Sequence, residues 1–219
     1  MAIVVNPRAG DSDGLVTEVS SNEAVEHPCL NVHIRNKEPK MMAPPRSIAQ
    51  IQSLINDNQP YRDDLDYIRE TLEERKVFIG QTISEQDGNT EASFCVTVGM
   101  FQHQLPELVM CGVPVPLVKN IVEELSQGHD FDREFLAGGR HKSIHGLIVM
   151  AMPIEQPESH DVLTICHDVY TLRGLPQIRA VQLVFADEGG AFPWSRNYCE
   201  QERKFQPVLG TAGSARLVN

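Results

Sequence analysis

The loop that follows the last apolar segment of the chain concentrates side chains capable of chemistry. It reads Asp187-Glu188-Gly189-Gly190-Ala191-Phe192-Pro193-Trp194 and holds two carboxylates, two glycines and the single tryptophan. Carboxylates can act as general bases, glycines let a backbone approach a ligand closely, and aromatic rings supply flat pocket walls. The loop therefore predicts one wall of a pocket, with an aromatic lid that seals the core as the equally simple alternative.

Two further patterns suggest chemistry but fit other roles better. His141 and His145 have a spacing that would place both on one face of a helix, ready for a metal ion. The chain there enters a strand-like segment, in which this spacing separates side chains by roughly 13 Å, so we interpret them as loop histidines. Ser159-His160-Asp161 contains the residue types of a hydrolase triad, but neighbours in sequence point in different directions. Helix N-capping explains this tripeptide better.

These residues must be positioned by a mixture of helices and strands. Apolar periodicity predicts one helix that begins near Ser47 and three more that span 63–76, 116–127 and 160–172. Short segments rich in apolar and β-branched residues predict strands at 77–83, 93–98, 108–111, 147–152 and 180–185. We therefore expect an α+β fold with a mainly antiparallel sheet and helices packed on one side.

The amino-terminal part of the chain has a different character. Residues 1–45 lack periodicity and contain Asn-Pro, His-Pro and Pro-Pro dipeptides, so we expect an extended arm with short strands near 3–5 and 30–34. We divide the chain into an arm with the first helix (1–60), an α+β domain (61–210) and a loose tail (211–219).

Composition excludes several function classes. The chain has 219 residues, with 19 Lys and Arg against 30 Asp and Glu, for a formal net charge of −11. This balance argues against nucleic acid and anionic membranes as partners. No amino-terminal signal is recognisable, and no apolar run approaches the roughly 20 residues of a membrane helix. Five cysteines without C-x-x-C spacing indicate reduced thiols. We expect a cytoplasmic protein without a cofactor.

Four segments of the sequence resemble a bacterial family known as domain of unknown function 4262. The family has a Y-T-V-G-L-like strand end, an H-P-E-L-like turn, and an L-Q-L-V-x-P-D-x-x-G-x-F-P-W block followed by Q-P-L-L-G. The counterparts here are residues 94–100, 106–108, 181–194 and 206–210. The resemblance covers about residues 64–210, with Ala186 in place of the family's proline and the family's histidine displaced to His103. It implies no activity, so it marks positions rather than chemistry.

The marked positions suggest one cleft. If the sheet brings the relevant strand ends together, a hydroxyl, an amide, a carboxylate and an indole share a polar site, with Glu107 at its rim. Asp187 and Glu107 are then the candidate catalytic groups. The alternative is scaffolding, in which Asp187 turns the chain and Gln182 satisfies a buried backbone group. The candidate ligand-binding residues are Thr97, Gly99, Gln182, Asp187, Phe192 and Trp194.

Two function classes follow from these observations. The first is a binding module, such as an immunity- or inhibitor-type protein, whose acidic surface recognises a basic protein partner. The second is an enzyme that acts on a small polar substrate near Asp187 and Trp194, with or without a divalent metal recruited through His103 or His141. The net charge and the lack of a catalytic signature favour the first.

Overall fold

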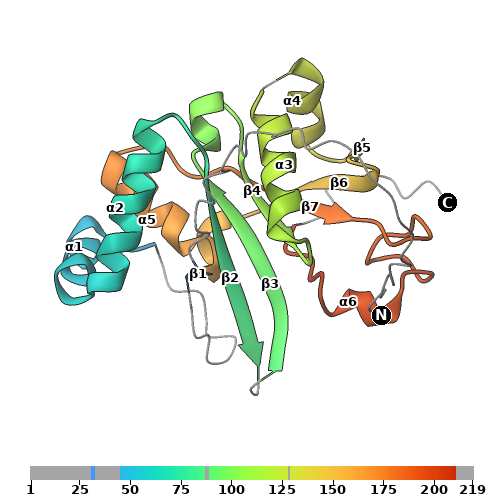
Figure 1. The fold of residues 1–219 in the computed structure, drawn as a ribbon, viewed down its shortest axis with the longest axis horizontal. Coiled ribbons are helices and arrows are strands. Elements are labelled where there is room, and N and C mark those ends of the chain that lie inside the picture. The colour runs from blue at the N-terminus through green and yellow to red at the C-terminus, as the bar shows by residue number, and fades with distance from the viewer. Residues whose placement is uncertain (1–30, 33–44, 87–88, 128, 211–219) are drawn as a thin grey trace, which may run out of the picture.

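The computed structural model describes residues 31–32, 45–86, 89–127 and 129–210 (Figure 1). Most of the expected amino-terminal arm, including the strand near 3–5, and the expected tail at 211–219 lie outside these residues. The strand expected at 30–34 is represented by β1 (Asn31–Val32), which pairs in parallel with Gln81 and Thr82.

The sheet is mixed and mainly antiparallel, as predicted. Its order is β1-β2-β3-β4-β7-β6-β5, and only the β1–β2 and β4–β7 pairs are parallel. All five strands expected in the domain are present, and the first two pair with each other in antiparallel fashion. β5 was not among the predicted strands, because only Ile144 in it is buried, and the interpretation of His141 as a loop residue is wrong because it begins this strand. The remaining strands are β2 (Phe78–Gln86), β3 (Asn89–Val98), β4 (Glu107–Cys111), β5 (His141–Ile144), β6 (Leu147–Pro153) and β7 (Ala180–Phe185).

Side-chain caps start the first two helices. Ser47 caps the first helix in a capping box with Gln50. Asn58 ends that helix and caps the second, which starts before the expected residue 63 because Pro60 fits its first turn. The helix expected at 160–172 begins only at Thr164, and the expectation that Ser159 caps it is wrong, because the Ser159 hydroxyl donates to the Gln156 carbonyl oxygen. The helices are α1 (Ile48–Asp57), α2 (Gln59–Glu73), α3 (Val115–Ser126), α4 (Asp130–Leu136), α5 (Thr164–Arg173) and α6 (Glu200–Arg203), with 3-10 turns η1 (Met100–His103), η2 (Pro157–Ser159) and η3 (Asp161–Leu163).

The expectation that all helices pack on one side of the sheet is wrong. Helices α1, α2 and α5 form one core with Val96 and Val109, whereas α3 and α4 form a second core with Leu108 and Leu183. Figure 1 shows the two groups on opposite sides of the central strands. The reason lies in β3 and β4, where successive residues are apolar, so that both faces of the sheet need cover.

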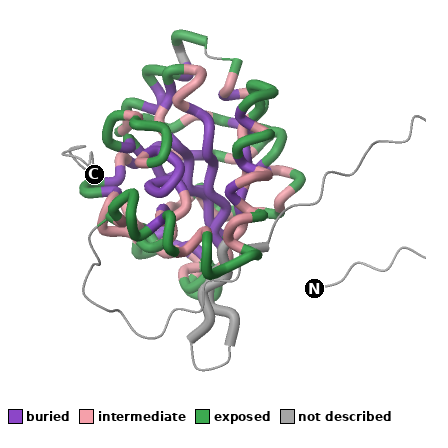
Figure 2. The backbone as a smooth tube through the Cα atoms, turned by 90° about the vertical axis from the view of Figure 1, so that its left-hand side faces the viewer, coloured by how far each residue is buried: buried purple, intermediate pink, exposed green. Residues whose placement is uncertain are grey.

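Burial is deepest in the middle of the sheet. All five residues of β4 are buried, and Figure 2 shows buried backbone in the centre with exposed segments outside it. No helix within the described ranges is both long and apolar enough to cross a membrane.

A polar clasp fastens the first two helices to α5. The Asp168 carboxylate is almost fully buried and its Oδ2 accepts hydrogen bonds from Arg46 Nη1 (2.6 Å) and Tyr61 Oη (2.5 Å). Its Oδ1 has no partner among the described residues. Burial raises the pKa of Asp168, and the two donors oppose that rise. Ile51 of α1 is fully buried in the same core. The segment that begins at residue 45 is therefore part of the folded unit.

Candidate functional site

Glu107 lies in a sealed junction at the start of β4. Its side chain has no solvent exposure. The carboxylate accepts hydrogen bonds from the hydroxyls of Thr97 (2.7 Å) and Tyr170 (2.8 Å). The backbone N–H groups of Gly99 (3.0 Å) and Met100 (3.4 Å) complete the set. Burial raises the pKa of Glu107, and these four donors oppose the rise. Both carboxylate oxygens are already engaged.

The junction explains why Thr97 and Gly99 occupy their positions. The Thr97 hydroxyl accepts a hydrogen bond from the Leu108 N–H (2.8 Å) and donates one to Glu107. It thus gives the Leu108 N–H a partner at the point where the pairing of β3 with β4 ends. Gly99 has φ +125°, and a Cβ there would lie 2.6 Å from Leu72 Cδ2. The positive φ favours glycine, and a Cβ would in addition force the buried Leu72 side chain to shift. Thr97, Gly99 and Glu107 thus form one buried structural unit.

Asp187 folds the glycine-rich loop back on itself. Its Oδ1 accepts from the Ala191 N–H (2.9 Å), and its Oδ2 accepts from the Cys199 N–H (3.0 Å). These backbone donors, Ala191 first, lower the pKa of Asp187. A carboxylate with a lowered pKa and two engaged oxygens is a weak general base.

The same loop displays an aromatic pair. The rings of Phe192 and Trp194 stack with centroids 5.0 Å apart and planes 3° from parallel. Arg203 of α6 donates to the carbonyl oxygens of Pro193 and Ser195 and lies over the Tyr198 ring. The loop is therefore braced from within, and Trp194 remains 38% exposed.

Two buried glutamines fasten the following segment to β7. Gln182 donates to the Pro207 carbonyl (2.7 Å) and accepts from the Leu209 N–H (2.6 Å). Gln206 accepts from the Phe185 N–H (2.6 Å) and donates to the carbonyl oxygen of the same residue (2.9 Å). Sequence reasoning missed Gln206, because a single glutamine in an aperiodic segment carries no signal of burial. The Q-P-x-L-G spacing was the only available hint.

The expected site residues therefore occupy two places. Thr97, Gly99 and Glu107 meet in the junction, whereas Asp187, Phe192 and Trp194 belong to a region formed by residues 187–210, which we name the carboxy-terminal block. Gln182 anchors this block from beneath. No hydrogen bond joins the two places within the described residues.

The comparison with known families agrees with the marked positions. A family model described as a domain of unknown function, DUF4262, matches residues 74–199. The chain belongs to the DUF4262 family. Its matched region includes the Glu107 junction and the Asp187 loop, and it ends before Gln206. No curated protein and no solved structure matches the chain.

The two histidines considered for a metal lie on different elements of this DUF4262 protein. His103 ends η1, and His141 begins β5. Among the described residues no group of three or more His, Cys, Asp or Glu side chains is arranged to hold a metal ion.

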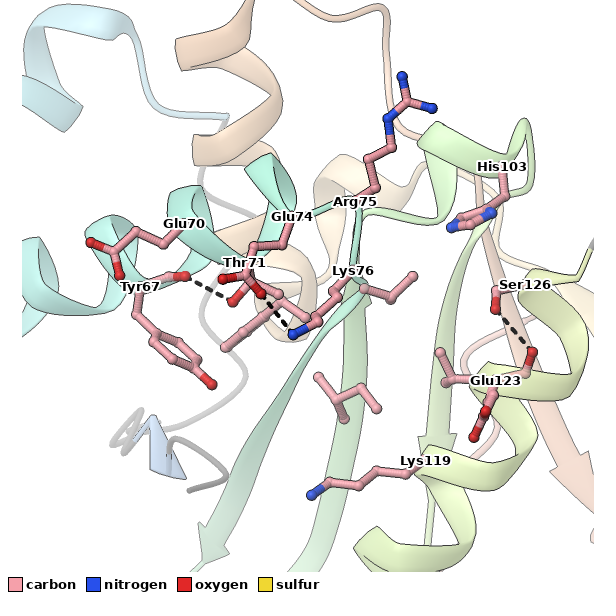
Figure 3. Close-up of a pocket in the computed structure, with 14 residues that line it drawn as sticks. Tyr67, Glu70, Thr71, Glu74, Arg75, Lys76, His103, Lys119, Glu123 and Ser126 are labelled. Atoms are coloured by element: carbon pink, nitrogen blue, oxygen red, sulfur yellow. Dashed lines mark hydrogen bonds and ion pairs between the residues drawn. The ribbon is translucent and has the colours of Figure 1, made fainter. Parts of the chain in front are cut away.

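Two surface hollows lie near the candidate site residues. One of about 350 Å³ adjoins the carboxy-terminal block and is lined by Met152, Pro193, Trp194, Arg203, Gln206, Pro207, Val208 and Gly210. A second, of about 590 Å³, lies between α2, the start of β2, η1 and α3 (Figure 3). His103 lines the second hollow.

Proposed function

We propose that this DUF4262 protein is a binding module that recognises a basic protein partner. The observation that carries the proposal is the stacked aromatic pair, which an internally braced loop holds at the surface. Exposed aromatic anchors on rigid supports are typical centres of protein interfaces, because they lose little entropy when they bind. An inhibitor- or immunity-type role, in which the module covers a basic enzyme, is one form of this function.

Exposed apolar side chains gather at the carboxy-terminal block. Of the six large apolar side chains that are exposed among the described residues, three belong to the block. A fourth, Ile148 of β6, lies beside the loop, since its Cδ1 would be 3.9 Å from a Cβ at Gly190. Trp194 and Val208 line the same hollow. The four are Ile148, Trp194, Phe205 and Val208.

Charge complementarity favours a basic partner. The chain carries a formal net charge of −11, and α2 alone contains five acidic and two basic residues. Several of the acids in α2, including Asp63, Glu70 and Glu73, are exposed. Such a field speeds association with a positively charged protein and weakens as salt is added.

The enzymatic alternative has less support. Glu107 is sealed and engaged by four donors, and Asp187 uses both oxygens to hold its own loop. Neither carboxylate is poised to take a proton from a substrate in this arrangement.

The test measures binding of the partner to the full chain. Partners retained at low salt are identified by mass spectrometry, and the affinity of each is then measured with wild type and Trp194→Ala. We expect Trp194→Ala to weaken binding at least tenfold, as for a hot-spot tryptophan, and a basic partner to bind less tightly as salt rises. Leu172→Ala removes a similarly exposed side chain from α5 (40% against 38%) and serves as the control. Equal affinity of both variants for the partner, or an affinity that does not change with salt concentration, would contradict the proposal.

A further inference from the structure

The hollow between α2 and α3 combines an apolar base with a charged rim. Its base is formed by Val77, Phe78, Ile79 and Val122, of which Phe78 and Val122 are buried in the two cores. Its volume of about 590 Å³ lies within the usual range of small-molecule sites. None of its lining residues belongs to the carboxy-terminal block, so the hollow is separate from the proposed partner surface.

The rim carries both signs of charge in equal number. Three acidic and three basic side chains line it, together with His103: Glu70, Glu74, Glu123, Arg75, Lys76 and Lys119. In a chain of net charge −11, such a balanced rim selects neither anions nor cations. It is suited to a molecule that carries one charge of each sign.

Some of these polar groups are already engaged. Lys76 Nζ pairs with Glu74 Oε2 at 2.7 Å. The Thr71 hydroxyl donates to the Tyr67 carbonyl oxygen, and the Ser126 hydroxyl donates to that of Glu123, both at 2.9 Å. These groups have little remaining capacity to orient a ligand.

Lys119 and Glu123 are two oppositely charged rim residues on the same helix. They are one turn apart on α3 and share a face of that helix. Within the described part of the chain, no hydrogen bond or ion pair engages the Lys119 ammonium or the Glu123 carboxylate. Figure 3 shows Lys119 extending from α3 at one end of the hollow and His103 on η1 at the other end, while the Arg75 guanidinium points away. One cation and one anion therefore stand beside an apolar base without partners.

We propose that this hollow binds zwitterionic apolar ligands, namely apolar amino acids and short peptides with free termini. The ligand carboxylate pairs with Lys119, and the ligand ammonium pairs with Glu123. The apolar side chains of the ligand lie on Val77, Ile79 and Val122, where burial of apolar surface supplies most of the affinity. The two charged contacts orient the ligand and disfavour molecules that lack either terminus.

Isothermal titration of the full chain with leucyl-leucine tests the site. We expect the free dipeptide to bind, and the N-acetylated and C-amidated forms to bind about threefold to tenfold less tightly, as for partly exposed charge pairs. Lys119→Gln should weaken binding of the free dipeptide by a similar factor, while binding of the C-amidated form should not change. Glu123→Gln should weaken the free dipeptide while leaving the acetylated form unaffected.

Controls make the outcome decisive. Lys204→Gln removes an exposed lysine at the end of α6, outside the hollow, and should bind the dipeptide as wild type does. Thermal melting of each variant verifies that it is folded. The proposal is overturned if no heat is detected up to about 10 mM dipeptide, if the blocked forms bind as well as the free one, or if Lys119→Gln behaves like Lys204→Gln.

Discussion

Replacing Thr97 with valine would test whether the Glu107 junction is a structural unit. Valine has nearly the same shape as threonine and suits a strand equally well, so the change removes only the hydroxyl. That hydroxyl donates to Glu107 Oε2 at 2.7 Å and accepts from the Leu108 N–H at 2.8 Å. Both bonds are fully buried, and water cannot replace either.

The expected cost follows from these two bonds. Losing a buried hydrogen bond to a carboxylate costs about 2 kcal/mol, and leaving the Leu108 N–H unpaired costs about 2 kcal/mol more. The methyl group that replaces the hydroxyl recovers about 1 kcal/mol. The free energy of unfolding should therefore fall by about 3 kcal/mol, a large fraction of the 5–15 kcal/mol of a typical domain.

Urea unfolding followed by circular dichroism measures this loss. With a slope of about 2 kcal/mol per molar urea, the midpoint should fall by roughly 1.5 M. Thr71→Val is the matched control, because that hydroxyl makes a single bond to the Tyr67 carbonyl on half-buried α2. We expect it to cost less than about 1 kcal/mol.

A Thr97→Val protein as stable as the control would refute this reasoning. It would mean that the junction tolerates an unpaired N–H, and that Glu107 does not depend on its donors. Tyr170→Phe adds a second check, because its hydroxyl donates to the other oxygen of Glu107. Since both side chains bind one carboxylate, the loss of unfolding free energy in the double variant should differ from the sum of the two single losses.

Three further changes test other contacts by urea unfolding. Gly99→Ala should destabilise by about 3 kcal/mol because its Cβ would clash at φ +125°, whereas Gly146→Ala, at φ +81° in open space, should cost about 1 kcal/mol. Arg46→Met should cost about 2 kcal/mol by leaving the buried Asp168 with Tyr61 alone, and adding Asp168→Asn should recover part of the loss. Asp187→Asn should be less stable than wild type at pH 7. Because the folded-state pKa of Asp187 is lowered, its contribution is present above the unfolded pKa and is lost as the pH falls through the folded pKa. The difference between the two proteins should therefore begin to shrink below about pH 4 and vanish only below the folded pKa.

The sequence pattern predicted the elements better than their packing. Strands such as 108–111 and 180–185 were recognisable because runs of apolar residues exclude other assignments. The same runs also contained the information that was missed. In β4, Leu108 faces one core and Val109 the other, which requires helices on both faces. A periodic pattern identifies the buried face of a helix without indicating which side of the sheet that helix covers.

The candidate site was predictable only in part. The marked motifs contain residues with specific hydrogen-bond partners, including Thr97, Gln182 and Asp187. Their arrangement in two places depends on β7 lying beside β4, a contact between distant parts of the chain that no local pattern encodes. The hollow at Lys119 is still less visible, because its walls come from four separate elements.

The position of β7 also determines the order in which the sheet can be completed during synthesis. β7 fits between β4 and β6, both of which precede it in the chain. Until the ribosome has released Ala180–Phe185, β4 and β6 expose unpaired edges of the kind that chaperones bind and that aggregate. The hydrogen bonds from the Leu209 and Gly210 N–H groups to Gln182 form later still, once residues up to Gly210 have emerged. During synthesis we therefore expect the interior strand β7 to be the last strand to join the sheet.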